Sequence, residues 1–205
     1  MGNPWEEIDL NDYESHMSLD SVFQLQTMNQ IMKKQFYDHP IRSVMILGIA
    51  GGNGLEHINT QLLDKVYGVD INKDYLRACE DRYPALQGIL ETIHADLTKD
   101  TNSLPCADLL VANLFIEYIG YECFQKVVKQ VNAQIVSCII QVNTDASFVS
   151  DSPYTYTFDR LDEVHHQMDE NALIKAMGEI GYKKEAHEEE KLPNGKKLVR
   201  IDFIH

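Results

Sequence analysis

The feature that most constrains this chain is an apolar run that ends in a cluster of glycines. Residues 44–58 read Val-Met-Ile-Leu-Gly-Ile-Ala-Gly-Gly-Asn-Gly-Leu-Glu-His-Ile, with four glycines among the seven positions from Gly48 to Gly54. Glycine allows a tight turn and a close approach of the backbone to a ligand, and such a turn after a first parallel strand lies at the ligand-binding crevice of a doubly wound sheet. We therefore predict a strand, a binding turn and then a helix over Leu55–Leu63.

Short apolar runs alternate with stretches of helical spacing through the middle of the chain. Strands are expected at Val44–Leu47, Val66–Val69, Ile89–His94, Leu109–Ala112 and Ile135–Gln141, and helices at Leu55–Leu63, Lys73–Arg82 and Glu117–Val131. Runs that are apolar on both faces are typical of parallel strands covered by crossover helices. Asn72 is placed to cap the second helix and Pro84 to end it, so the pattern predicts repeated βαβ units.

The segments on either side add a helical start and an antiparallel end. Apolar spacings of three and four predict a helix over Ser18–Phe36, and a helix at Asn171–Met177 precedes two strands, Tyr182–Glu188 and Lys197–Ile204, joined through Pro193-Asn194-Gly195. We expect an α/β fold: a doubly wound, mostly parallel, seven-stranded Rossmann-like sheet with a C-terminal antiparallel hairpin. An N-terminal helical extension or lid covers residues 1–42, and the binding domain covers residues 43–205, with a loop insertion near the site at 143–169.

A second signal stands 22 residues after Gly48, where the run Val66-Tyr-Gly-Val ends in Asp70. A carboxylate at the end of a second strand can accept hydrogen bonds from both hydroxyls of a ribose. An acid in this position can also be a plain helix cap. Together with the glycine turn, Asp70 indicates a cofactor that contains a nucleoside.

These features resemble the class I S-adenosylmethionine-dependent methyltransferase family. The resemblance spans about Ser43 to Gln141 and continues through His94-Ala-Asp-Leu and Asp108-Leu-Leu-Val-Ala-Asn-Leu-Phe-Ile-Glu-Tyr. In that family the glycine turn holds the methionine part of the cofactor, the acid after strand two holds the ribose, and an Asp after strand three holds the adenine amino group. The resemblance implies S-adenosylmethionine (SAM) as cofactor, S-adenosylhomocysteine (SAH) as product, and cofactor contacts from Gly48, Ala50, Gly52, Gly54, Asp70, Ile71, Asp96, Leu97 and Asn113.

The chain departs from the family pattern in three places. Ile46 stands where the family often has an acid, and Ala50 stands where it has its middle glycine. The Asn-Pro-Pro-aromatic motif of enzymes that methylate amide or exocyclic nitrogens is missing, since Asn113 is followed by Leu114 and Phe115. The missing motif argues against DNA and glutamine as acceptors.

Two other functions stay open at the level of the sequence. Gly48, Gly52 and Gly54 also satisfy the G-x-x-x-G-x-G turn of short-chain dehydrogenases, which would make the chain an NAD(P)-dependent oxidoreductase. None of the ten tyrosines is followed by Lys in the Tyr-x-x-x-Lys spacing of those enzymes. The third function is a SAM-binding regulatory protein without turnover of its own.

Methyl transfer from a sulfonium is an in-line displacement, so positioning and exclusion of water supply much of the acceleration. An acceptor that carries a proton needs a base, and we expect Glu117, Tyr118 and His166 as candidates, with His165 beside them. Glu117 could equally be a first-turn residue favoured by the helix dipole, and Tyr118 a core aromatic. We also expect the segment with Tyr13, before the first helix, to fold over the cofactor together with His16 and Met17.

Composition limits the partners. Eighteen basic and 32 acidic residues give a formal charge of −14, and such a field repels phosphate backbones and anionic lipid. We expect a small-molecule substrate, no nucleic acid, no membrane and a cytoplasmic location, because the start of the chain resembles no signal peptide; a homodimer stays open. The four cysteines, Cys79, Cys106, Cys123 and Cys138, lie far apart, so we expect reduced, buried thiols and no metal.

Overall fold

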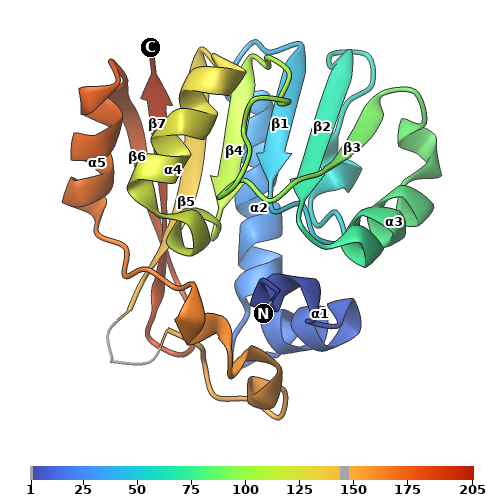
Figure 1. Ribbon diagram of the computed structural model, residues 1–205, viewed down its shortest axis with the longest axis vertical. Coiled ribbons are helices and arrows are strands. Elements are labelled where there is room, and N and C mark those ends of the chain that lie inside the picture. Colours follow the sequence, from blue (N-terminus) through green and yellow to red (C-terminus); the bar gives the residue numbers. More distant parts are fainter. Residues whose placement is uncertain (1, 144–147) are drawn as a thin grey trace.

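The computed structural model describes residues 2–143 and 148–205, and its centre is a sheet with the strand order β3-β2-β1-β4-β5-β7-β6 (Figure 1). Strands β1 to β5 are parallel, and β7 pairs antiparallel with both β5 and β6, so β7 runs against the other strands. The expected doubly wound sheet with a closing hairpin is confirmed. The strands are β1 Ser43–Leu47, β2 Lys65–Asp70, β3 Leu90–His94, β4 Leu109–Asn113, β5 Ile135–Val142, β6 Lys183–Lys191 and β7 Lys197–Ile204.

Helices cover both faces of this sheet because successive side chains of a strand point to opposite sides. In β1, Val44 and Ile46 pack on one face with α2 (Gln24–Tyr37) and α3 (Lys73–Arg82). Met45 and Leu47 pack on the other face with α4 (Ile116–Val131) and α5 (Glu170–Glu179). A run that is apolar at every position is therefore what a central strand between two helical layers requires.

The helix predicted over Leu55–Leu63 is wrong. After the glycine turn the chain makes only the short 3₁₀ helix η2 (Leu55–His57) before β2 begins. Helix α2, from the other side of the turn, occupies the face of the sheet that a crossover helix would cover: a Cβ placed on Gly54 would lie 2.8 Å from Met32 Sδ. The apolar residues of this connection pack against α2 and the sheet. Leu55 and Leu63 are buried in that contact.

The helix predicted over Ser18–Phe36 is present as α2, but it begins only at Gln24, and a separate helix precedes it. Helix α1 (Leu10–Ser18) ends at a turn in which the Val22 and Phe23 amides donate to the Leu19 carbonyl, and α2 follows. Phe23 has a φ of 56°, which interrupts the helical backbone. Tyr13 and its neighbours therefore lie within the first α-helix and do not precede it.

Other local predictions agree with the structure. Asn72 caps α3 through its side chain, which accepts from the Asp74 and Tyr75 amides, and Pro84 opens a 3₁₀ turn after α3 has ended. The expectation of four buried thiols holds for Cys79 and Cys138 and is wrong for the other two: Cys106 is exposed in the loop before β4, and Cys123 is half-buried. Within the described ranges, no helix combines the length and the apolar character that crossing a bilayer demands. Residues 144–147 of the expected loop insertion lie outside the described part, and the division at residue 42 stays a prediction.

A buried polar network fastens α2 to the sheet. Gln35, fully buried, exchanges two amide hydrogen bonds with Asn113 of β4, at 3.0 and 2.9 Å, and its Nε2 lies 2.8 Å from Ser137 Oγ on β5. Ser137 donates in turn to Asp202 Oδ1 at 2.5 Å on β7, and Asp202 is paired with the buried Arg200 at 2.5 and 3.0 Å. Each buried polar group thereby finds a partner, as burial demands.

We expect Asp202→Asn to lower the free energy of unfolding by about 3 kcal/mol, because the buried Arg200 guanidinium loses its main counter-ion and keeps only Asp38. Burial raises the pKa of Asp202, but hydrogen bonds from Arg200 and Ser137 outweigh it and hold the pKa below its usual range. The stabilisation is therefore present above pH of about 4 and is lost as the pH falls further.

Urea denaturation at pH 7 measures this loss. Asp64→Asn is the control, because it breaks the exposed Arg42–Asp64 ion pair and is expected to cost less than about 1 kcal/mol. Equal losses in the two variants would show that the buried network stabilises the fold no more than an exposed ion pair does.

Candidate functional site

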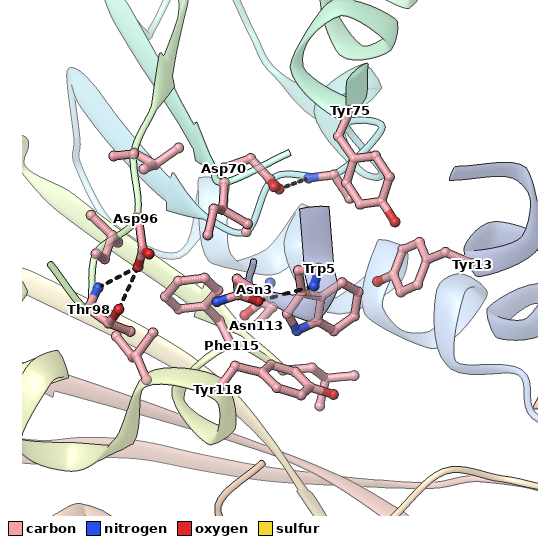
Figure 2. Close-up of a pocket in the computed structure, with 18 residues that line it drawn as sticks. Asn3, Trp5, Tyr13, Asp70, Tyr75, Asp96, Thr98, Asn113, Phe115 and Tyr118 are labelled. Carbon is pink, nitrogen blue, oxygen red and sulfur yellow. Dashed lines mark hydrogen bonds between the residues drawn. The ribbon is translucent and has the colours of Figure 1, made fainter. Parts of the chain in front are cut away.

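A cavity lies at the carboxyl ends of β1, β2 and β4, where open α/β sheets bind their ligands. Its walls come from the glycine turn, the residues that follow β2 and β3, the start of α4 and the first residues of the chain; we call it the first cavity (Figure 2). The structure places seven of the nine predicted cofactor residues in these walls: Gly48, Ala50, Asp70, Ile71, Asp96, Leu97 and Asn113.

Gly52 and Gly54 do not line the first cavity. A Cβ on Gly52 would lie 2.8 Å from both Cys79 Sγ and Tyr83, and one on Gly54 would meet Met32. Both have φ values of 85–88°, which side chains rarely adopt. These glycines therefore shape the turn and let the helices approach it closely, a packing role that the motif alone does not distinguish from ligand contact.

Asp70 holds the glycine turn in place from the end of β2. Its Oδ2 accepts from the Ala50 amide at 2.9 Å and its Oδ1 from the Asn72 amide at 2.9 Å. Burial raises the pKa of this carboxyl, and the backbone hydrogen bonds partly offset that effect. Each carboxylate oxygen has a second lone pair, so Asp70 can still accept hydrogen bonds from a ligand.

Ala50 adopts the left-handed backbone conformation, with a φ of 48°. This is the conformation in which glycine is normally preferred, and it explains why the family pattern has a glycine at this place. The hydrogen bond from the Ala50 amide to Asp70 supports the strained residue. The departure at Ala50 therefore leaves the shape of the turn intact.

Asp96 lies farther along the first cavity, after β3. Its Oδ1 accepts from the Thr98 amide and hydroxyl at 3.1 and 2.6 Å, and its Oδ2 lies 2.7 Å from Lys99 Nζ. Burial raises the pKa of this carboxyl, but Lys99 and Thr98 outweigh it and lower the pKa below the usual range. Asp96 is therefore a fixed, ionised acceptor beside the apolar Ile71 and Leu97.

Asn113 lines the first cavity, and its side-chain amide exchanges two hydrogen bonds with Gln35 on α2. Its predicted contact with the cofactor stays a prediction. Sequence reasoning missed Gln35. The available signal was a glutamine within the apolar stripe of a helix, next to Phe36 and one turn after Met32, where a polar side chain requires a buried partner.

The start of the chain folds across the first cavity. Trp5, in the 3₁₀ helix η1 (Pro4–Glu6), packs edge-on against Tyr118 at 4.9 Å and Tyr13 at 5.8 Å between ring centroids, and Tyr13 stacks on Tyr75 at 6.2 Å. Figure 2 shows Asn3 and Trp5 between the acids on one side and Tyr118 on the other. Sequence reasoning missed Trp5, although a lone tryptophan in an acidic N-terminal segment was a usable signal.

A second cavity adjoins the first and shares Trp5, Tyr13, Leu114 and Tyr118 with it. We define the second cavity by Glu117, by His16 and Met17 of α1, and by the aromatic and apolar side chains of residues 148–168. The structure thus brings the predicted N-terminal residues and part of the loop segment together over one space. Its described part includes the 3₁₀ helices η4 (Thr155–Phe158) and η5 (Leu161–Glu163).

Of the predicted bases, Glu117 and Tyr118 line the cavities, but His166 does not. The backbone amide of His166 donates to the Glu117 carbonyl at 2.7 Å, and its ring lies beside Gly120. Its neighbour His165 faces the second cavity instead, with its ring stacked 3.7 Å from Phe148. The side to which each of two consecutive residues of an irregular segment points cannot be assigned from sequence, so the sequence does not show which of the two histidines faces the cavity.

Glu117 lies in the first turn of α4, ahead of a break in that helix. Gly120 has φ and ψ of 72° and 166°, so the turn that carries Glu117 and Tyr118 is set apart from the rest of the helix. The residue is 6% exposed, and its buried Oε2 has no hydrogen-bond partner. Burial raises the pKa of Glu117 from its ordinary 4.5 to about 7.

The histidines of the second cavity are held in the neutral form. Burial, with a smaller effect from Lys196, lowers the pKa of His16 to about 4, and its Nδ1 lies 2.7 Å from Ser152 Oγ. Burial also lowers the pKa of His165. At neutral pH these rings therefore add hydrogen-bonding capacity but no positive charge.

Unsatisfied polar atoms gather at the two cavities. Among the described residues, four buried side-chain atoms lack a hydrogen-bond partner, and three of them belong to cavity-lining residues: Trp5 Nε1, Tyr75 Oη and Glu117 Oε2. Buried polar groups are normally paired, so a cluster of exceptions calls for an explanation. A bound ligand with polar atoms provides one.

The described residues contain one grouping with metal-ligand chemistry, formed by Glu170, His187 and Glu189. It lies on α5 and β6, where His187 is already 2.8 Å from Glu170 and Glu189 is 2.8 Å from Lys197. These ion pairs account for the grouping. The expectation that the protein uses no metal stays a prediction.

No protein-family model matches the sequence, and no curated protein does. Many solved structures share the fold. Magnesium protoporphyrin IX methyltransferase (ChlM) from Synechocystis PCC 6803, solved with bound SAH, aligns with a TM-score of 0.66 at 12% identity over 95% of this chain and 93% of its own. The methyltransferase domain of bacterial CtHen1-C aligns with 0.63 at 15% identity over 96% and 98%.

The [4+2]-cyclase SpnF aligns with a TM-score of 0.64 at 8% identity, over 87% of this chain and 80% of its own. A structure named for a cyclisation thus has the same fold as structures named for methyl transfer. At these identities the likeness confirms the expected methyltransferase-type fold. The reaction has to be argued from the site itself.

We expect Glu117→Gln to stabilise the protein at pH 8 by about 3 kcal/mol, because the variant avoids burying a charge. A group whose folded pKa is raised contributes its stability below the unfolded pKa of 4.5 and loses it as the pH rises towards about 7. The difference between variant and wild type is therefore expected to vanish near pH 4. Denaturant titrations across pH 4 to 8 measure it, with Glu122→Gln on the exposed side of α4 as control; a gap that does not depend on pH would contradict the burial of an ionisable Glu117.

Proposed function

We propose that this protein is a SAM-dependent methyltransferase that transfers a methyl group to a small molecule and releases SAH. The observation that carries the proposal is the arrangement of the first cavity. The glycine turn, Asp70 and Asp96 line one space at the carboxyl ends of the strands, and a second space adjoins it. One cavity suits a nucleoside cofactor and the other suits an acceptor.

The residues present fit the cofactor. Asp70 has spare lone pairs for two ribose hydroxyls, and Asp96 is an ionised acceptor suited to an amino group. The apolar Ile71 and Leu97 line the same space and suit the faces of an adenine ring. The unpaired Tyr75 hydroxyl and Trp5 indole N–H are further groups that a bound nucleoside amino acid could satisfy.

When bound, the cofactor supplies an electrophilic methyl group on a sulfonium. The protein has to bring an acceptor atom into line with that group and keep water out. Trp5, Tyr13, Leu114 and Tyr118 belong to both cavities, so they form the passage through which donor and acceptor meet. Because Trp5 and Tyr13 come from the start of the chain, closure of this segment excludes water from the passage.

A small acceptor follows from the walls of the second cavity. Helix α1 and the 3₁₀ segments of residues 155–163 cover it, and the buried Phe158 and Leu161 anchor these segments together with Ile8. Such a covered space admits a small molecule more readily than a polymer. The formal charge of −14 further disfavours nucleic acid.

The two rival functions have less support. An oxidoreductase of the short-chain type needs a Tyr-x-x-x-Lys pair that the sequence lacks. A SAM-binding protein without turnover would not need the second cavity with its unpaired carboxylate. Detection of SAH after several turnovers with an acceptor excludes that function.

Calorimetric titration with SAM, SAH, NAD and NADP is expected to show binding of the two sulfur nucleosides only. Asp70→Asn is expected to weaken SAH binding about 30- to 100-fold, because hydrogen bonds from the ribose to a charged acceptor are lost. Binding of a dinucleotide alone would overturn the proposal.

The matched control is Asp108→Asn. Asp108 also accepts from two backbone amides, those of Arg42 and Ser43 at 2.8 and 2.9 Å, but at the opposite end of the sheet. Circular dichroism and melting curves of both variants check the fold. Asp108→Asn is expected to bind SAH within twofold of wild type, and equal weakening in both variants would assign the effect to structure.

A further inference from the structure

The second cavity has a chemical character that narrows the acceptor. We propose that the acceptor is a small primary or secondary amine that enters as an ammonium ion, binds against the Glu117 carboxylate between aromatic rings, and is methylated on nitrogen. The inference rests on the proposed function, since it names the substrate class of the same site.

Glu117 is a buried carboxylate, and its Oε2 lacks the hydrogen-bond donor or cation that burial requires. It is 6% exposed, it lines the second cavity, and its Oε2 receives no hydrogen bond. A buried, unpaired charge is costly, and a cation that donates hydrogen bonds to it removes most of that cost. An ammonium ligand is the complement to this feature.

The neighbouring amide groups and the His16 ring are already occupied. The side-chain amides of Gln24 and Gln141 pair with each other, and Gln141 Nε2 also donates to Asn143 Oδ1 at 2.6 Å and to the Phe148 carbonyl at 2.8 Å. His16 is engaged with Ser152. None of these groups turns to Glu117, so its free oxygen is left for a ligand.

The rest of the wall also suits a cation. Trp5, Tyr13, Tyr118, Phe148 and Phe158 contribute aromatic rings to the second cavity. The faces of such rings attract ammonium groups, most strongly where water is excluded. The amine is thereby held by one carboxylate and several ring faces.

The charges around the second cavity point the same way. Of the described lining residues, Glu117 is the only one whose side chain can take up a charge near neutral pH, because the two lining histidines are neutral there. The nearby Lys196 is not among the lining residues, and its Nζ donates to the Phe148 carbonyl at 3.0 Å. An anionic acceptor would therefore meet a carboxylate and no opposing cation.

An amine also explains the site better than an alcohol does. A hydroxyl offers Glu117 one neutral hydrogen bond and leaves the buried charge uncompensated, whereas an ammonium ion neutralises it. A carboxylic acid acceptor would add a second negative charge. The buried acid therefore selects the amine over both.

The chemical step balances with groups already named. The ammonium gives one proton to the Glu117 carboxylate, and the freed lone pair of nitrogen attacks the methyl carbon. The N–CH₃ bond forms as the S–CH₃ bond breaks, and the bonding electrons pass to sulfur, giving the neutral sulfide of SAH. The positive charge moves to the methylated ammonium, and Glu117 returns its proton to water when the products leave.

The test compares probes that share a body and differ in their end group: benzylamine, benzyl alcohol and benzoate, and 2-phenylethylamine, 2-phenylethanol and phenylacetate. Binding to the SAH-loaded protein is measured by calorimetry, and methylation with SAM by mass spectrometry. The amines are expected to bind at least tenfold more tightly than their partners and to give N-methylated products. Equal or tighter binding of the alcohols or carboxylates would overturn the proposal.

Glu117→Gln is expected to lose at least tenfold in amine affinity and to keep its SAH affinity within twofold, because Glu117 lines the second cavity and not the first. Glu122→Gln, exposed on the same helix, is expected to behave as wild type. An unchanged amine preference in Glu117→Gln would sink the assignment to this carboxylate.

The probes are also titrated into the protein without SAH, which separates the two proposals. A preference for amines that depends on Glu117, in a protein that binds no SAH, would support the amine site and overturn methyl transfer. SAH binding without any such preference would leave the proposed function standing and overturn the amine acceptor.

Discussion

The placement of α2 against the sheet is the constraint on which the rest of the molecule depends. Gln35 reaches Asn113 and Ser137, and through Ser137 the charged pair of Asp202 and Arg200, so one helix is tied to three strands by buried hydrogen bonds. Such a network has few alternative arrangements, because any shift of α2 leaves several buried groups unpaired. With α2 covering this face of the sheet, the connection from β1 to β2 needs only a 3₁₀ turn.

The candidate site lies at the carboxyl ends of the parallel strands, where Asn113 of this network also lines the first cavity. Asp70 receives the Ala50 and Asn72 amides, so one side chain stabilises the glycine turn, the entry into α3 and an acceptor facing the first cavity. The left-handed conformation of Ala50 is supported by that contact. Asp70 therefore has a structural role and also faces the cavity. A residue that only caps a helix would not have both roles.

The second cavity is assembled from segments that are far apart in the chain. Tyr13 and His16 come from α1, Glu117 from the turn before the break at Gly120, and His165 from the loop before α5. The first residues close it by aromatic packing of Trp5 on Tyr118. Burial without a partner makes the Glu117 carboxylate unfavourable for the stability of the fold, and it also favours binding of a cationic ligand. Functional residues often reduce stability in this way.

The sequence by itself determined the strands, their parallel arrangement and the closing hairpin, and it placed Asp70 at the end of one strand and Asp96 just after another. These features depend on local periodicity and on the geometry of a strand end. Only the tertiary structure decided the absence of the Leu55–Leu63 helix, which of His165 and His166 faces the second cavity, the hydrogen bonds between Asn113 and Gln35, and the lack of a partner for Glu117 Oε2. Each of these depends on which distant segment packs against a residue, and local propensity does not contain that information.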